Sequence, residues 1–340
     1  MTVIIGIDPH KASHTAVAIG CDEQQLAEIR VRATCQQTAK LLAWAEPLGP
    51  RTWAVESAGG LGYLLSQQLV GAGERVLDVP ATLASRVRVL GTGRSNKNDP
   101  NDALSVAIAA LRSPGLRSVE AANHGEVLRL LAKRNHELGR LRNIVVSRLH
   151  AALANLSPGG ISKELNASDA IRLLNDLEPI TAVEQTRYDL AHELLDDVER
   201  LDAQLKESHG RIKTAVQASG TSLTELYGVG PILACELIGY TGDVRRFTTR
   251  DQFASYAGVA PVERSSGGRI YFRLSRRGNR QLNHAIHMVA ICQIRQKDSE
   301  GRVYFEKKVA EGKTKREAIR SLKRHVSNAV YRRLLIDAQQ

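Results

Sequence analysis

The amino-acid sequence predicts an α/β domain at the N-terminus, followed by a helical coiled-coil segment and a mostly α-helical C-terminal domain. In residues 1–115, short apolar runs typical of strands alternate with helical patterns. Residues 125–217 show helical periodicity alone, and residues 218–340 contain a glycine-flanked turn between helices. A chain of 340 residues with 43% hydrophobic residues can build more than one core, so we expect three segments with these bounds.

The order of the N-terminal strands limits the folds that the first domain can adopt. Three apolar runs, VIIGID, HTAVAIG and AEIRVRA, follow one another closely and predict an antiparallel meander. A helix is expected from Thr38 to Ala45, then a strand at TWAVES, a helix after Gly60 and a strand at RVLDVP. Three strands followed by strand–helix–strand units is the order of a ribonuclease-H-like domain.

Four acidic residues of this domain form the strongest candidate site. Asp8 and Glu56 each end an apolar strand-like run, whereas Asp99 and Asp102 open a helix in KNDPNDALS. We expect one cluster built from three elements. Clustered carboxylates repel one another unless cations lie between them. A pair of Mg²⁺ ions that holds the attacking and leaving oxygens of a phosphodiester is the commonest reason for such a cluster, with Mn²⁺ as the alternative ion.

The helix that carries two of these residues also has a purely structural interpretation. Asp99 occupies the position of an N-cap, and Pro100 suits the first helical position. Asp102 lies three residues later, on the same side of the helix. Asp99 could therefore only cap the helix, and Asp102 could only complement its dipole. The combination with Asp8 and Glu56 at strand ends favours the metal site.

Residues 125–217 carry two apolar seams, separated by a turn at SPGG, residues 157–160. The first seam consists of Leu138, Leu141, Val145, Leu149 and Ala152. The second consists of Leu194, Val198, Leu201, Leu205, Ser208 and Ile212. Alternate spacings of four and three residues indicate heptads. We favour an antiparallel helical hairpin that contributes to dimerisation, although the seams could also pack only within one chain.

The run LTELYGVGPILACELIGYTGD resembles a helix-hairpin-helix. Gly228 and Gly230 flank Val229, and Pro231 begins the next helix. Such a turn points backbone N–H groups at a phosphate. The alternative is an ordinary corner between helices that needs glycine for a positive φ.

The net charge of +11 is concentrated in the C-terminal part of the chain. From Arg245 to the end there are 22 Lys and Arg against 8 Asp and Glu, whereas the first 244 residues have a small negative excess. A polyanion is the natural partner of such a segment, and nucleic acid is the leading candidate. A solvated basic surface is the alternative. Aromatic residues make up only 4% of the chain, which argues against base stacking as the main contact.

Cysteine usage and hydropathy indicate a cytosolic protein. Cys21, Cys35, Cys235 and Cys292 are scattered, which argues against a zinc site and a disulfide framework. We expect no signal peptide before VIIGID and no membrane span, because no apolar run approaches the ~20 residues that a bilayer requires.

The stretch FASYAGVAPVERSSGGRIYFRLSRRGNRQLNHAIHMVA resembles a known protein family. Together with IGIDPHK, VES, KNDPNDA and the GVG turn, it closely resembles the transposases of the insertion sequence 110 family, which are RNA-guided DNA recombinases of bacterial mobile elements. The resemblance covers nearly the whole chain. It implies a RuvC-like domain with an Asp-Glu-Asp-Asp set, followed by the family's transposase domain.

The resemblance also implies a mechanism and its residues. The metal-binding tetrad falls on Asp8, Glu56, Asp99 and Asp102, and the serine nucleophile, which forms a covalent phosphoserine link to DNA, falls on Ser266, with Ser265 as the competing assignment. The implied composite site takes tetrad and serine from separate domains. A hydroxyl needs activation to attack, and nearby arginines would hold the scissile phosphate. The candidate nucleic-acid-binding residues are Gly228, Gly230, Arg269, Arg273, Arg276, Arg277 and Arg280.

The resemblance further implies partners. A structured bridge RNA encoded by the element would pair with donor and target DNA duplexes, so that base pairing selects the sequence. Strand exchange on two duplexes suggests a homodimer that assembles to a tetramer. Two other functions remain open on the residues alone: a metal-dependent nuclease that resolves Holliday junctions, which would need the tetrad but not Ser266, and a non-enzymatic nucleic-acid-binding protein, which would tolerate Asp8→Asn.

Overall fold

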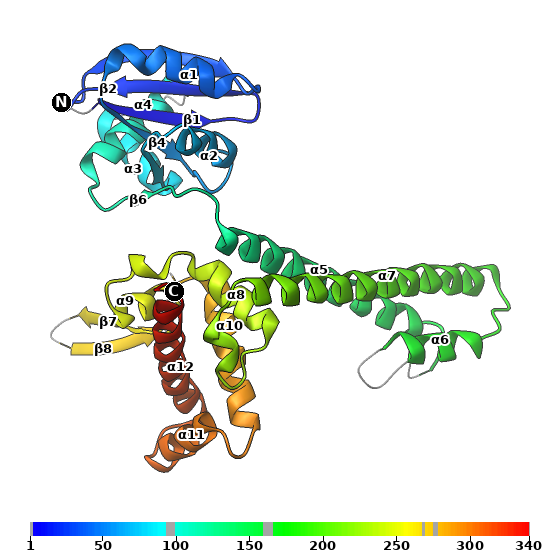
Figure 1. Cartoon of the computed structure of the whole chain (residues 1–340). Helices are drawn as coiled ribbons and strands as arrows, with labels where there is room; N and C mark the ends of the chain where they lie inside the picture. The colour runs from blue at the N-terminus through cyan, green and yellow to red at the C-terminus, as the bar shows by residue number, and fades with distance from the viewer. Residues whose placement is uncertain (1–2, 93–98, 159–165, 267–268, 275–277, 340) are drawn as a thin grey trace. The chain divides into compact units, whose positions relative to one another are not determined.

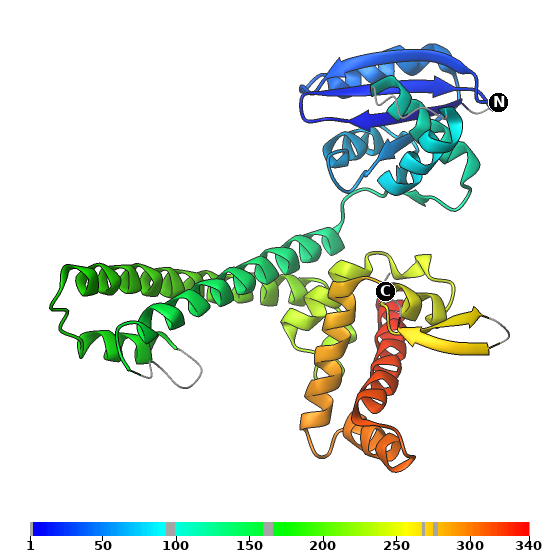
Figure 2. The ribbon, with the colours of Figure 1, turned by 180° about the vertical axis from the view of Figure 1, so that it is seen from behind.

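The computed structural model describes residues 3–92, 99–158, 166–266, 269–274 and 278–339. The chain divides into two compact units, Met1–Ala122 and Asn123–Gln340, which we describe separately (Figures 1 and 2). The first unit is a mixed α/β structure, and the second is mostly helical.

Among the described residues, the first unit forms a sheet with the strand order β3-β2-β1-β4-β5-β6. The strands are β1 (Val3–Pro9), β2 (Ser13–Ile19), β3 (Gln25–Arg32), β4 (Arg51–Glu56), β5 (Val76–Val79) and β6 (Arg117–Ser118). β2 pairs antiparallel with both β1 and β3, which confirms the predicted meander. β4 pairs parallel with β1 and β5. This order and these directions are those of a ribonuclease-H-like domain.

Helices cover both faces of this sheet (Figure 1). They are α1 (Gln37–Ala45), α2 (Tyr63–Gly71), α3 (Ala81–Thr92) and α4 (Asp99–Arg112), with a 3₁₀ turn, η1 (Glu46–Leu48), after α1. Successive side chains of a strand face opposite sides. Ile5 and Ile7 of β1 therefore pack with α1 and α2, whereas Ile4 packs with α3 and α4. Helix α3 was not predicted: no element was expected between the strand at RVLDVP and the segment before Asp99.

The contact between α4 and β1 is unusually close at Gly6. A Cβ atom on Gly6 would lie 2.2 Å from the carbonyl oxygen of Ala103 and 2.8 Å from the Cβ of Ala107. The backbone of α4 therefore lies directly on the strand, as only glycine beneath it allows. Asp8 lies two residues after Gly6, so it shares the face of β1 that α4 covers.

The second unit begins with a long helical hairpin. Helices α5 (His124–Ala154) and α7 (Ala182–Ala218) lie side by side, with the short α6 (Ala167–Asn175) between them in the chain (Figure 2). They run antiparallel, because Arg142 pairs with Asp202 and Asn135 accepts a hydrogen bond of 3.2 Å from Ser208. The two helices thus form an antiparallel hairpin within one chain, and its contribution to dimerisation stays a prediction.

The predicted seams are buried only in part. Val198, Leu201, Ser208 and Ile212 of the second seam are buried. In the first seam Leu138 and Leu149 are buried, but Leu141 is 41% exposed, which corrects its predicted place. The buried pair is eleven residues apart, which is three turns of an α-helix, so both side chains lie on the same side of α5.

Helices around one core complete the second unit. They are η2 (Ser222–Glu225), α8 (Pro231–Thr241), η3 (Val244–Arg246), α9 (Arg250–Tyr256), α10 (Arg280–Arg295), α11 (Glu300–Ala310) and α12 (Lys315–Asp337). Phe253 packs between Phe247 and Tyr331, and the Tyr331 hydroxyl donates to the Phe247 carbonyl at 2.7 Å. At the end of α12, Asp337 accepts hydrogen bonds from Thr221 and Ser222, which ties the C-terminal helix to η2.

The glycine turn before α8 differs from the expected helix-hairpin-helix in one respect. Its first element is the short 3₁₀ helix η2 and not a full α-helix. Gly228 has φ +86°, and a Cβ there would meet the Val289 carbonyl of α10 at 3.2 Å, so glycine is required at this position. Gly230 has φ −83°, with open space where a Cβ would lie, and Pro231 begins α8 as predicted.

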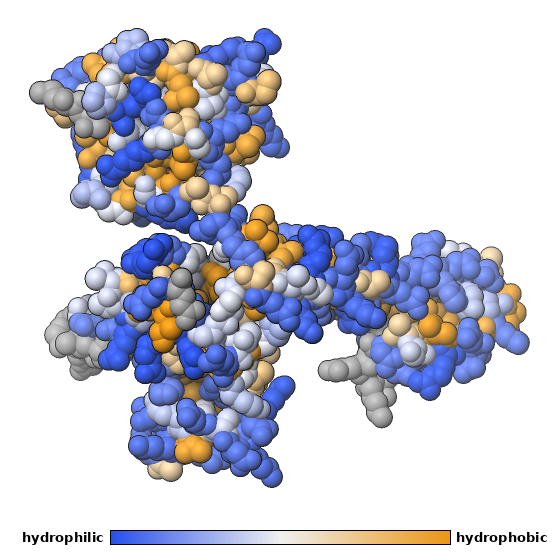
Figure 3. Space-filling view, viewed as in Figure 1, coloured by the Kyte–Doolittle hydropathy of each residue, from blue (hydrophilic) through white to orange (hydrophobic). Residues whose placement is uncertain are grey.

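Hydrophilic residues cover most of the face seen in Figure 3, with smaller hydrophobic areas between them. Among the helices in the described part of the chain, none is both long and apolar enough to span a membrane.

We expect Gly6→Ala to destabilise the first unit by about 1–3 kcal/mol, because the added methyl group would overlap the backbone of α4. The free energy of unfolding from urea denaturation measures this effect. Gly71→Ala at the end of α2 is the matched control, because nothing lies within 4 Å of its Cβ position. A Gly6→Ala protein as stable as the Gly71→Ala protein would contradict the close packing.

Candidate functional site

Three elements of the first unit bring the four predicted carboxylates together. Asp8 lies near the end of β1, Glu56 is the last residue of the neighbouring parallel strand β4, and Asp99 and Asp102 lie in the first turn of α4. Parallel pairing of β1 with β4 places the first two at the same edge of the sheet. The packing of α4 on β1 places the other two above them. Asp99 is the first described residue of α4, and the residues directly before it lie outside the described part of the chain.

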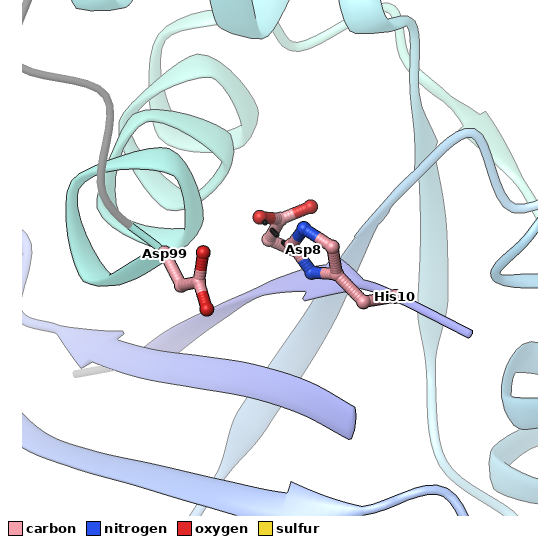
Figure 4. Close-up of side chains that lie close together, drawn as sticks. All are labelled: Asp8, His10 and Asp99. Atoms are coloured by element: carbon pink, nitrogen blue, oxygen red, sulfur yellow. Dashed lines mark ion pairs between the residues drawn. The ribbon is translucent and has the colours of Figure 1, made fainter. Parts of the chain in front are cut away.

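The tightest part of this cluster includes a residue that we did not predict. One oxygen of Asp8, one oxygen of Asp99 and one ring nitrogen of His10 all lie within 4.8 Å of one another. Figure 4 shows these three side chains directed toward a common space. The Nδ1 atom of His10 lies 3.6 Å from the Asp8 carboxylate. His10 follows Asp8 by two residues, so strand periodicity could have indicated it.

Two arginines balance part of the negative charge. Arg88 of α3 forms an ion pair with Asp102, whose side chain is almost fully buried. Arg30 of β3 lies 3.2 Å from the Asp99 carboxylate. Neither partner was predicted, because no helix was expected where α3 lies, and because strands β2 and β1 separate β3 from β4 in the sheet.

Burial and the neighbouring charges of the cluster change the pKa of Glu56. Burial, followed by the negative charges of Asp8 and Asp102, raises the pKa of Glu56 above its ordinary value of 4.5. The positive charges of Arg88 and His10 oppose this rise only in part. A bound cation would favour the ionised form of such a carboxyl group.

The donor set suits a hard divalent cation. Carboxylate oxygens are the ligands that Mg²⁺ prefers, at about 2.1 Å, and imidazole nitrogen also binds first-row metals. Two ligands of one octahedral Mg²⁺ lie roughly 3–4 Å apart. Donors separated by up to 4.8 Å would therefore have to move closer together to bind one ion. The hydroxyl of Thr15, which is opposite Asp8 in the sheet and buried, has no hydrogen-bond partner among the described residues. An ion with its bound water molecules would supply such a partner.

The predicted serines lie in a β-hairpin of the second unit, for which no strands were predicted. Strand β7 (Pro261–Ser266) pairs antiparallel with β8 (Arg269–Leu274). Ser265 is exposed, and Ser266 is opposite Arg269 at the end of the pairing.

The predicted arginines fall on and after this hairpin. Arg273 is opposite Val262 in the ladder, and Arg280 is exposed at the start of α10. Arg276 and Arg277 lie outside the described residues. The structure therefore gives backbone positions for the hairpin residues, and their roles stay predictions.

Comparison with known families identifies the class of protein. A family model described as the transposase IS116/IS110/IS902 family matches residues 220–306, and a second transposase model, of the IS110 DEDD group, matches residues 5–158. The second match contains all four carboxylates, and the first contains both the glycine turn and the hairpin. The chain belongs to the IS116/IS110/IS902 family of transposases.

Full-length relatives support this assignment. A 42 kDa uncharacterised protein of insertion element IS900 from Mycobacterium paratuberculosis is 27% identical, covering 96% of this chain and 94% of the relative. A 44.8 kDa uncharacterised protein of insertion element IS116 from Streptomyces clavuligerus is 26% identical, covering 94% and 91%. Among solved structures, T. thermophilus RuvC in complex with a Holliday junction substrate matches 35% of this chain and 100% of its own, with 16% identity and a TM-score of 0.29.

We expect Glu56→Gln to raise the thermal unfolding midpoint by about 1–3 °C at pH 7 in the presence of EDTA. A carboxyl group whose pKa is raised in the folded state stabilises that state only while it is protonated, and this stabilisation is lost as the pH rises through the raised pKa. The advantage of the glutamine should therefore vanish near pH 4.5 and below, and appear as the pH rises from there. Differential scanning calorimetry across this pH range measures it.

Divalent cations should make the wild-type protein more stable than the Glu56→Gln variant, the reverse of the order expected in EDTA. Mg²⁺ or Mn²⁺ should stabilise the wild-type protein more than the Glu56→Gln variant, because the variant has lost a ligand. Glu46→Gln changes an exposed carboxylate of η1 in the same unit and should respond to the cation like the wild type. An equal response of all three proteins would rule out Glu56 as part of a metal site.

Proposed function

We propose that this transposase cuts and rejoins DNA strands for the insertion and excision of its element, with Mg²⁺ held by the acidic cluster and a serine as nucleophile. The observation that carries the proposal is the convergence of Asp8, Glu56, Asp99 and Asp102 from β1, β4 and α4. Four carboxylates at one edge of a sheet are costly to fold unless a cation uses them. Membership of a transposase family makes a phosphodiester the natural substrate.

The residues of the first unit would divide the work. Asp8 and Asp99, which have oxygens within 4.8 Å of each other, would hold the ion, with His10 beside them and Glu56 completing the set. A bound divalent cation polarises the phosphate and stabilises the charge that develops on the attacking and leaving oxygens. Arg88 holds Asp102 in place through an ion pair, and release of Arg88 would free Asp102 for a second ion.

The second unit would supply the nucleophile. The hydroxyl of Ser266 attacks phosphorus and loses its proton, the phosphodiester bond to one deoxyribose oxygen breaks, and that oxygen takes a proton as it leaves. The product is a phosphoserine link that a second deoxyribose hydroxyl can resolve by the reverse reaction, which rejoins the strand without hydrolysis. Ser265 is the competing nucleophile. Arginines of the hairpin segment, among them Arg269 and Arg273, would bind the scissile phosphate.

The proposal extends to the partners of the reaction. DNA duplexes of donor and target would be its substrates, and a structured RNA encoded by the element would select the sequences by base pairing. The excess of Lys and Arg after Arg245, with few aromatic residues, supports contacts to nucleic-acid backbone by charge and shape. A homodimer that assembles to a tetramer would hold two duplexes for exchange, with the α5–α7 hairpin as a candidate interface. Exposed apolar side chains on this hairpin, such as Leu130 and Ile144, support that role.

One feature favours a second candidate function, a metal-dependent nuclease that acts on DNA junctions. The carboxylate cluster lies wholly within the first unit, whose strand order is ribonuclease-H-like. Such a unit can hydrolyse DNA with its metal ions alone. Hydrolysis would use water in place of serine and would leave no link between protein and DNA.

The two candidates separate in a trapping experiment. The protein is incubated with RNA transcribed from the flank of its element, labelled donor and target duplexes and Mg²⁺, and then denatured. We expect a protein–DNA adduct that Ser266→Ala abolishes and Ser265→Ala leaves. Asp8→Asn should lower the cleavage rate by at least about 10²-fold, because the ion loses a ligand.

Other outcomes would reject parts of the proposal. An adduct that persists in Ser266→Ala and disappears in Ser265→Ala would move the nucleophile by one residue. Cleavage that needs Mg²⁺ but gives no adduct in any variant would favour the nuclease. If the wild-type protein binds DNA but cleaves it under no condition, the result would favour a non-enzymatic DNA-binding protein.

A further inference from the structure

A basic pocket lies between α10 and α12 of the second unit. Its volume is about 590 Å³. Arg280, Asn283 and His287 lie on one face of α10, at spacings of three and four residues. Arg316, Arg320 and Lys323 present a matching stripe from α12. Two facing helices thus direct four permanent or near-permanent cations at one space.

Few anions compensate these cations: Glu317 of α12 interacts with the charge of Arg320 but does not line the pocket. No carboxylate belongs to the described residues that line the pocket. Within the described part of the chain, Arg280, Arg316, Arg320 and Lys323 also form no ion pair with Asp or Glu. In contrast, Arg324 and Arg333 of the same helix pair with Asp251 and Glu225. Like charges gathered in a recess destabilise the free protein unless an anion enters.

The pKa shifts of two groups show the same excess of positive charge. Burial, followed by the charge of Arg320, lowers the pKa of Lys323. Burial, followed by the charges of Lys323 and His284, lowers the pKa of His287. An anion in the pocket would oppose both shifts by stabilising the protonated forms.

The pocket is built onto the base of the serine-bearing hairpin. Its floor includes Gly258, which precedes β7, and Gly278, which follows β8. A Cβ on Gly278 would lie 2.4 Å from the Cα of Gly258, so the two ends of the hairpin cross in close contact. Asn283 donates to the Gly258 carbonyl at 3.0 Å and accepts from the Lys323 ammonium at 2.7 Å. The position of Lys323 is thereby fixed relative to the hairpin.

We infer that this pocket binds a backbone phosphate of the DNA strand on which the hairpin acts, at a point away from the bond that is cut. Strands β7 and β8 are each six residues long, so the hairpin reaches about 20 Å beyond the pocket at about 3.3 Å per residue. At about 3.4 Å per nucleotide, the bound phosphate would lie roughly six nucleotides from the serine. The pocket is a positioning site that fixes the register of DNA on the second unit. This inference rests on the proposed function for the identity of the strand.

Equilibrium binding of a short fluorescein-labelled DNA duplex to the full-length protein in EDTA, followed by anisotropy over a range of salt concentrations, tests the inference. For Arg320→Gln/Lys323→Gln we expect about tenfold weaker binding at low salt and a salt slope smaller by about one. Arg316→Gln/Arg320→Gln changes only exposed side chains and should show the same loss. Arg332→Gln, an exposed arginine of α12 outside the pocket, is the matched control and should bind like the wild type.

Both double variants must unfold at the temperature of the control for this comparison to hold. Wild-type affinity and salt slope in Arg316→Gln/Arg320→Gln would overturn the inference, as would a loss confined to an RNA hairpin of matched length. The outcome is independent of the trapping experiment, because EDTA prevents cleavage. Weakened binding without any cleavage would refute the proposed function and leave the phosphate pocket, whereas normal binding with adduct formation would refute only the pocket.

Discussion

The close packing of α4 on β1 at Gly6 is the contact on which the acidic site depends. Because Gly6 has no side chain, the backbone of α4 at Ala103 packs directly on β1. The first turn of α4 therefore lies over the end of the sheet. Asp8 lies two residues further along the same face of β1. Asp99 and Asp102 belong to α4, some ninety residues later in the chain. The closeness of these carboxylates is therefore a consequence of backbone packing and not of any attraction between them.

That packing creates an electrostatic problem that the protein solves only in part. Arg88 neutralises Asp102, and Arg30 approaches Asp99, while Glu56 is left with a raised pKa beside Asp8. A cluster with incomplete compensation is tuned to receive a cation, because the free energy lost to repulsion is recovered when the ion binds. The same arrangement explains why folding stability and metal affinity should respond in opposite directions to removal of one carboxylate.

The second unit has a local excess of positive charge, the opposite of the acidic cluster in the first unit. Its helices α10 and α12 gather arginines and a lysine around one recess with no acidic partner among the described lining residues. Elsewhere on α12, arginines are paired with carboxylates in the ordinary way. We thus propose a negative site for cations in one unit and a positive site for phosphates in the other. A protein that acts on a phosphodiester with the help of metal ions requires both kinds of site.

The sequence by itself determined the order of strands along the chain, the antiparallel helical hairpin and four carboxylates of the candidate site. The reason is that strand alternation and helical spacing are local patterns, visible in the sequence without knowledge of the fold. The sequence did not show α3, the pairing of β7 with β8, or Leu141 as an exposed residue of α5. Nor did it show His10 as a neighbour of Asp99, Arg88 as the partner of Asp102, or the pocket at Lys323. These features join residues that are distant in the chain or share a face only after helices have packed, and only the tertiary structure decides which faces meet.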